Sequence, residues 1–210
     1  MKARILAALA LLPLGACASN DDLVEGGVAV VRSACPAVGV PAGTGDITLF
    51  NPPASRDATA IDVVGTISNV RADCTDAGDD VVTQVSFDVS ARRPRPEGAR
   101  DVTLPYFIAI TRGGSNVVAK RVGEAQLHFD AGQTLARTTG TASSYVTRSA
   151  ATLPADVREK LTRRRKAGEE DAAIDPLSTP EVRDAVLAAS FEALVGFQLT
   201  QDQLRYNATR

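Results

Sequence analysis

The chain has 210 residues with 23 basic and 25 acidic side chains, a formal net charge of −2, 4% aromatic residues and no tryptophan. This length suits one domain, or one domain with an appendage, and it is sufficient for a buried core. The lack of a basic bias argues against nucleic acid as a partner, and the scarcity of aromatic residues argues against a site that stacks bases or sugars.

The first sixteen residues have the parts of a bacterial signal peptide. Lys2 and Arg4 give a positively charged start, and an apolar segment follows from Ile5 to Leu14. That segment falls within the roughly 7–15 residues of a signal peptide and is well short of the ~20 that span a bilayer. We expect residues 1–16 to be removed, which lowers the net charge from −2 to −4 because Lys2 and Arg4 leave with them.

The residues that close this segment, Leu14-Gly15-Ala16-Cys17, resemble the lipobox of bacterial lipoproteins. The resemblance implies that the Cys17 thiol carries lipid, palmitate included, and that the chain is cleaved in front of it. Ala18, rather than aspartate, follows the cysteine, and in the sorting rule of these lipoproteins this favours the outer membrane. The resemblance therefore implies a Gram-negative outer-membrane lipoprotein whose soluble part faces the periplasm.

Three cysteines occur, namely Cys17, Cys35 and Cys74. In an oxidising compartment this number predicts lipid on Cys17 and a disulfide between Cys35 and Cys74; the alternative is two free buried thiols. Closing a loop of about 40 residues stabilises a fold by roughly 4 kcal/mol in the chain-entropy model. A zinc site is disfavoured, because the chain has one histidine and no Cys-x-x-Cys motif, and we expect no cofactor.

Short apolar segments predict a series of strands after the tether of residues 17–27. They cover residues 28–31, 46–50, 61–67, 81–91, 104–111, 117–122, 124–130 and 134–146. Segment 104–111 is apolar nearly throughout, which predicts a central strand, and Gly65 predicts a bulge or close packing. Residues 73–80, which include Gly78, predict a turn.

Two of these segments alternate between apolar and polar residues, which predicts one buried and one solvated face. The side chains expected to face inward are Val81, Val85, Phe87, Val89, Ala91, Ala125, Leu127 and Phe129. His128, the one histidine, falls on the solvated face. A catalytic histidine needs a nucleophile beside it, and nothing in the sequence places one there, so we interpret His128 as a structural surface residue.

The spacing of the strands, about 8–15 residues without helical segments between them, predicts an antiparallel β-sandwich. Residues 64–69, a turn and residues 81–91 resemble the paired strands of immunoglobulin-like modules in bacterial envelope proteins. The expected fold class is therefore mainly β, an antiparallel immunoglobulin-like β-sandwich over residues 28–150 with a C-terminal helical appendage.

Composition changes near Leu153-Pro154, and residues 151–210 predict a helical segment. Residues 155–170 are charged helix formers, and residues 181–190 predict a second helix with Thr179 as its cap and Pro180 in its first turn. Residues 191–199 are apolar and fit either a last strand or more helix, while residues 201–210 predict a polar terminus. Whether this segment packs on the sandwich is left open by the sequence.

The strongest local charge is the basic cluster, which consists of Arg163, Arg164, Arg165 and Lys166. Such a cluster fits contact with anionic lipid head groups or an acidic partner. The alternative is a solvated helix face, since acidic residues 169–171 follow directly.

Two other patterns fit ordinary turns better than ligand sites. Asp76, Asp79 and Asp80 match no known calcium loop in their spacing and fit a solvated hairpin tip. The segment Gly43-Thr44-Gly45 lacks the lysine and hydroxyl residue of a phosphate loop. No metal site and no catalytic residue is therefore expected.

These features together predict a non-catalytic structural or interaction module of the cell envelope rather than an enzyme. Its expected partners are the membrane, through Cys17, and an envelope protein. One alternative is a lipid or small-ligand carrier with a pocket between the sheets or under the C-terminal helices. The other is a hydrolase, which needs two acidic groups that converge in a cleft with perturbed pKa values.

Overall fold

The computed structural model describes residues 23–24, 27–28, 34–163, 168 and 173–209. β1 (Leu23–Val24) and β2 (Gly27–Val28) pair with each other in a short antiparallel ladder. The signal segment, Cys17 and most of the predicted strand 28–31 lie outside the described residues.

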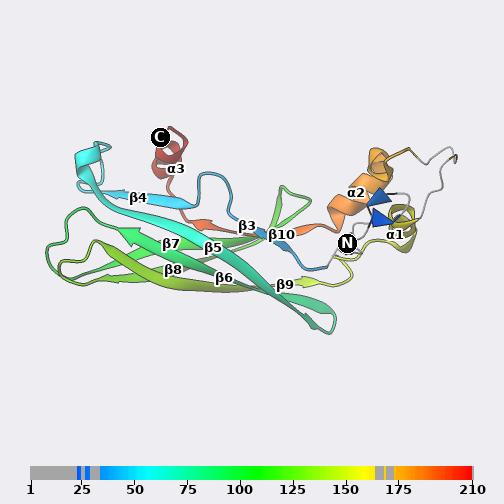
Figure 1. The fold of residues 1–210 in the computed structure, drawn as a ribbon, viewed down its shortest axis with the longest axis horizontal. Coiled ribbons are helices and arrows are strands. Elements are labelled where there is room, and N and C mark those ends of the chain that lie inside the picture. The colour runs from blue at the N-terminus through cyan, green and yellow to red at the C-terminus, as the bar shows by residue number, and fades with distance from the viewer. Residues whose placement is uncertain (1–22, 25–26, 29–33, 164–167, 169–172, 210) are drawn as a thin grey trace, which may run out of the picture.

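Two four-stranded sheets stack face to face (Figure 1). The first has the order β3 (Ala37–Gly39), β10 (Phe191–Phe197), β7 (Arg100–Arg112), β8 (Asn116–Phe129). The second has the order β4 (Asp46–Phe50), β5 (Ile61–Ala77), β6 (Asp80–Arg92), β9 (Leu135–Thr147). Apart from the parallel pair β3–β10, all neighbours run antiparallel. The predicted fold class, a mainly β sandwich with C-terminal helices, is confirmed.

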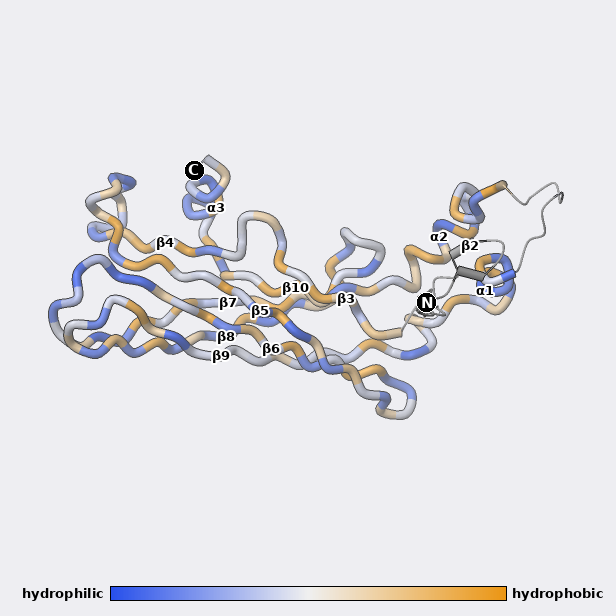
Figure 2. Tube along the Cα trace, in the orientation of Figure 1, coloured by the Kyte–Doolittle hydropathy of each residue, from blue (hydrophilic) through white to orange (hydrophobic). Residues whose placement is uncertain are grey.

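The core forms because apolar side chains recur at every second position of the long strands. Every side chain predicted to face inward from β6 and β8 is buried. The hydropathy along the strands alternates accordingly (Figure 2). Gly65 is a point of close packing, as predicted, because a Cβ atom there would lie 2.6 Å from Leu104 Cδ1. β7 is also central as predicted, since it pairs with both β10 and β8.

Two strand boundaries differ from the predictions. The turn predicted over residues 73–80 is wrong: β5 continues to Ala77 and pairs with β6, so the chain reverses around Gly78. The polar residues there lie on an exposed antiparallel ribbon, and polar side chains alone do not distinguish such a ribbon from a turn. Segments 117–122 and 124–130 form the single strand β8, because Gly123 continues the pairing opposite Tyr106.

The C-terminal segment begins with two short helices. α1 (Ala155–Thr162) and α2 (Pro180–Ala188) pack through Val157, Val182 and Val186 at one end of the sandwich (Figure 1). Single 3₁₀ turns, η1 (Ala58–Ala60) and η2 (Pro176–Ser178), lie in the connections before β5 and α2. Pro180 opens α2 as predicted, but Thr179 makes no side-chain cap hydrogen bond. The predicted helix over 155–170 is too long, because Arg163 is already extended.

The rest of the C-terminal segment packs on the sandwich. Residues 191–197 form β10, which lies between β3 and β7 with Ala193, Val195 and Phe197 fully buried. The polar terminus forms a helix, α3 (Gln201–Thr209), which lies above β4 and has no buried residue (Figure 1). Thr200 and Gln203 exchange side-chain to backbone hydrogen bonds, a capping box that starts this helix. The Tyr206 ring then packs edge-on against Phe50 at 5.1 Å.

The disulfide between Cys35 and Cys74 is present, as predicted, with the two Cα atoms 6.0 Å apart. Cys35 is separated from β3 of the first sheet by Pro36 alone, and Cys74 lies on β5 of the second. The bond therefore joins the two sheets at the end that carries α1 and α2 (Figure 1).

Arg93, the first residue of the connection between β6 and β7, is a buried charged residue. Its side chain is 4% exposed and donates to four carbonyl oxygens of the loops at the opposite end of the sandwich, those of Pro96, Gly98, Asp130 and Gln133. The guanidinium carbon also lies 5.0 Å from the centroid of the Phe129 ring. The charge is thus satisfied by backbone oxygens, and one side chain holds the loop before β7 to the loop before β9.

We predict that Arg93→Met lowers the free energy of unfolding by about 2–4 kcal/mol, because it leaves buried carbonyl oxygens without a donor. Urea unfolding followed by circular dichroism measures the change. The matched control is Arg92→Met at the exposed neighbouring position, where we expect a change within about 0.5 kcal/mol. Equal effects of the two substitutions would contradict the buried role of Arg93.

Candidate functional site

β8 and β9 are edge strands of the two sheets, as β3 and β4 are at the opposite edges. Each is the last strand of its sheet and pairs on one side only, β8 with β7 and β9 with β6. The two strands approach each other along the same side of the sandwich without forming a ladder. We call the gap between them the seam. A free edge exposes backbone N–H and C=O groups that can pair with another strand.

Tyr106 closes the seam at one point from within. Its ring packs edge-on against Phe87 with the centroids 4.9 Å apart, and its hydroxyl donates to the Thr141 carbonyl oxygen of β9 at 3.3 Å. Gly123 on β8 gives the ring its space, since a Cβ atom there would lie 2.6 Å from Tyr106 Cζ. Tyr106 therefore links β7 to the far edge of the other sheet.

The two halves of β8 differ in their exposure. Residues 124–129 alternate between exposed and buried, whereas every residue from 116 to 122 is exposed. Val117, Val118 and Val122 in that half are 56%, 50% and 59% exposed. Val118 lies in a β-bulge, since Thr111 pairs with Val117 and Ile110 with Ala119. This half of β8 therefore presents three valines that no other described part of the chain covers.

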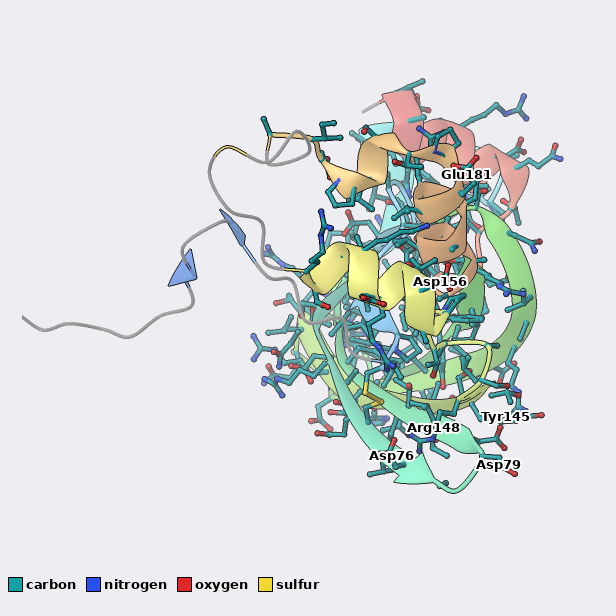
Figure 3. All side chains as sticks on the ribbon, turned by 90° about the vertical axis from the view of Figure 1, so that its right-hand side faces the viewer. Asp76, Asp79, Tyr145, Arg148, Asp156 and Glu181 are labelled. Atoms are coloured by element: carbon teal, nitrogen blue, oxygen red, sulfur yellow. A yellow bond between two sulfur atoms is a disulfide. The ribbon has the colours of Figure 1, made fainter. Side chains whose placement is uncertain are left out.

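Beside this exposed half, the seam opens into a cavity of about 330 Å³, which we call the seam pocket. Its floor is apolar and consists of Ile108, Ile110, Val146 and Phe191. Residues 118–121 of β8 form one wall and residues 143–145 of β9 the other. Tyr145 is 66% exposed and projects outward near Arg148, on the side of the β5–β6 hairpin (Figure 3). The seam pocket thus lies between two free strand edges.

The wall formed by β8 carries two adjacent positive charges. Arg121 pairs with Ile108 in the ladder and so shares its core-facing side, while Lys120 pairs with Ala109 on the outer side, where its Nζ lies 4.7 Å from the Phe107 ring centroid. Within the described part of the chain, neither cation forms an ion pair. The rim of the seam pocket is therefore positive on both faces of β8.

A second hollow, of about 580 Å³, lies between α1, α2 and Cys35. Its wall includes Ala34, which directly follows a segment outside the described residues.

The residues proposed for membrane contact are mostly outside the described part of the chain. Cys17 and residues 164–166 of the basic cluster lie there, while Arg163 follows the last residue of α1. In the part of the chain that the structure describes, no helix has the length and apolar character needed to cross a membrane.

The acidic hairpin tip is held by an ion pair. Arg148 lies 2.9 Å from Asp76, and its backbone N–H donates to the Asp79 carbonyl oxygen (Figure 3). Among the described residues, no group of three or more histidine, cysteine, aspartate or glutamate side chains is placed to hold a metal ion.

Three ionisable groups have shifted pKa values with clear causes, namely the paired Asp62 and Arg100, and His128. A two-pronged hydrogen bond from Arg100, with distances of 2.8 and 2.6 Å, lowers the pKa of the Asp62 carboxyl. This keeps Asp62 ionised, the opposite of the raised pKa of a catalytic general acid. Asp101, which lies opposite His128 on β7, accepts a hydrogen bond from its Nδ1 at 2.6 Å and raises the pKa of that histidine.

The sequence did not predict the seam, because the pattern of residues 117–122 does not show which of their side chains point toward the core. In the sequence Val-Val-Ala-Lys-Arg-Val, both the odd-numbered and the even-numbered positions hold apolar and charged side chains, so the two faces of the strand are alike. Such a pattern is typical of a strand whose two faces have similar surroundings. It is the one feature of the sequence that could have pointed to this strand. That the strand is a free edge, and that Tyr106 leaves a pocket beside it, depends on long-range packing.

We predict that His128 titrates above its ordinary pKa of 6.5 and that Asp101→Asn brings the value down. Since protonated His128 is favoured in the folded state, its contribution to stability is present below pH 6.5 and is lost as the pH rises through the folded-state pKa. An NMR titration of the ring protons measures this. Asp130→Asn is the control and should have a smaller effect. An unchanged pKa in Asp101→Asn would contradict the cause given.

Comparisons with known proteins were made for the whole chain. No protein-family model matches it. No curated protein matches it either. The function therefore has to be inferred from the chain's own residues, above all from the seam.

Proposed function

We propose that this protein is a non-catalytic interaction module of the bacterial cell envelope, which binds a partner protein along the seam. The observation that carries the proposal is the exposed half of β8, where three valines lie on a free strand edge beside an apolar pocket. Lone exposed apolar residues are ordinary, but several of them on one free edge beside an apolar pocket are typical of a contact surface.

The proposed place of action is the periplasmic side of the outer membrane, with Cys17 as the lipid anchor. Its support is the lipobox-like segment Leu14-Gly15-Ala16-Cys17 and the disulfide, a bond that is typical of an oxidising compartment. An anchored module has to find its partner in the same compartment, which fits an envelope protein.

The proposed orientation places α1 and α2 toward the membrane. The described chain resumes at Ala34, beside the disulfide, at the same end as these helices. Arg163, the first residue of the basic cluster, follows α1 at that end. A basic cluster near anionic head groups gains electrostatic attraction, so contact between the cluster and the membrane remains part of the proposal.

We predict that Cys17→Ser abolishes metabolic labelling with palmitate and releases the protein from the membrane fraction. The cause is the loss of the only thiol that the lipobox-like segment presents. Fractionation of cells and autoradiography measure both effects. The matched control is Ser19→Ala in the same tether, which should leave labelling intact. Membrane association of unlabelled Cys17→Ser protein would refute the anchor.

We predict that a photo-crosslinking amino acid in place of Tyr145 or Val122 captures one discrete partner in living cells. Both positions are exposed at the seam. Gln84, exposed on the outer face of β6, is the control position and should give no such product. Equal crosslinking from all three positions, or none from the two seam positions, would refute the seam as the contact surface.

A further inference from the structure

We propose that the seam accepts one extended strand of a partner protein, with acidic side chains beside Lys120 and Arg121 and aliphatic side chains in the seam pocket. This inference rests on the proposed function and names the kind of partner. Three properties of the described residues support it: the free backbone of β8, the position and volume of the seam pocket, and the charge of its rim.

The backbone of residues 116–122 is ready to receive a strand. It is already in β conformation, because β8 pairs with β7 on both sides of the bulge at Val118. Its other edge faces the seam and has no strand partner in the described structure. Adding a strand to such an edge forms main-chain hydrogen bonds with no reorganisation of the sheet, which is a common mode of peptide recognition.

The seam pocket lies where alternate side chains of an added strand would point. Side chains on one face of a strand recur about every 7 Å, because each residue advances about 3.3 Å and successive residues alternate. The core-facing positions of β8 at the pocket are Ala119 and Arg121, which pair with Ile110 and Ile108 of the floor. An added strand in register with them would direct its own core-facing side chains over the same apolar floor. A volume of about 330 Å³ accommodates a small number of aliphatic groups.

The charge of the rim selects the occupant. Lys120 and Arg121 lie on opposite faces of β8, so an added strand meets a cation whichever face its acidic residues occupy. Opposite charges stabilise a cross-strand pair and like charges destabilise it. A second copy of this chain that paired through β8 would bring these cations close to their own counterparts. The complementary partner is therefore an acidic strand from a different protein.

A lipid fits these observations less well. An acyl chain would cover the floor of the seam pocket, but it would leave the free N–H and C=O groups of residues 116–122 unpaired. It would also leave unexplained why the exposed valines of β8, at 50–59% exposure, extend beyond the pocket along the strand. A strand accounts for the edge, the pocket and the charge together.

The test uses the mature lipidated protein in nanodiscs and synthetic ten-residue peptides. The acidic peptide alternates valine with glutamate, and the basic peptide alternates valine with lysine. Fluorescence anisotropy measures their binding at low ionic strength. We expect the acidic peptide to bind at least about tenfold more tightly than the basic one, because the rim is positive.

Charge reversal tests the rim. We expect Lys120→Glu/Arg121→Glu to reverse the preference, so that the basic peptide binds more tightly. The matched control is Arg92→Glu/Arg137→Glu, a pair of exposed cations at the opposite end of the sandwich, which should leave the preference unchanged. A preference that is the same in all three proteins would overturn the proposal.

Two further variants test the strand and the pocket separately. N-methylation of every second peptide amide removes the donors on one edge of the peptide. Two peptides are compared, one methylated at the odd-numbered amides and one at the even-numbered amides. Binding should be abolished in one of them and retained in the other. Ala119→Trp, at an exposed position in the wall, should fill the pocket and weaken binding by about tenfold or more, whereas Gln84→Trp on the outer face should not. Circular dichroism confirms that the variants fold.

The other occupants appear as distinct results. If both N-methylated peptides lose binding equally, or if neither loses it, strand addition is overturned. Displacement of a fluorescent fatty acid by Ala119→Trp, with no peptide binding, would assign the pocket to a lipid. Dimerisation of the wild-type protein that Val118→Asp abolishes would assign the seam to a second copy. If crosslinking from Tyr145 succeeds in cells while all peptides fail, the interaction module stands and the strand mechanism is wrong.

Discussion

The contact between Tyr106 and Phe87 determines how the two sheets meet at their free edges. Both rings need glycines opposite them: a Cβ atom at Gly140 would lie 2.2 Å from Phe87 Cζ, and one at Gly123 would lie 2.6 Å from Tyr106 Cζ. Interiors tolerate neither voids nor overlaps, so these ring–glycine pairs set the approach of β8 and β9. The seam is closed where Tyr106 reaches β9, and it is open where no comparable ring spans it.

The ends of the sandwich are held by different chemistry. At one end the Cys35–Cys74 disulfide joins the sheets covalently. At the other end, the Arg93 side chain donates hydrogen bonds to four carbonyl oxygens. Asp62 and Arg100 form an ion pair there between β5 and β7. Such fixed ends give the free edges between them a defined geometry. A rigid edge loses little entropy when it pairs, which favours its use for binding.

The exposed half of β8 departs from the usual protection of edge strands. The charges of Lys120 and Arg121 discourage pairing with a second copy, because each would meet a like charge. Three exposed valines on the same strand favour burial by a partner other than a second copy. An edge strand that repels the same strand of a second copy, and that also exposes apolar side chains, is suited to a different protein of opposite charge.

The sequence by itself determined the fold class, most strands, the inward-facing residues of β6 and β8 and the disulfide, because alternation and cysteine number are local or countable signals. The lipid on Cys17 and the membrane location remain predictions from the sequence. Tertiary structure alone decided that residues 191–197 form a central strand, that Arg93 is buried, and that β8 and β9 are free edges around a pocket. Strand order and edge position arise from pairings between residues far apart in the chain, and a hydropathy pattern does not encode which neighbour a strand will lack.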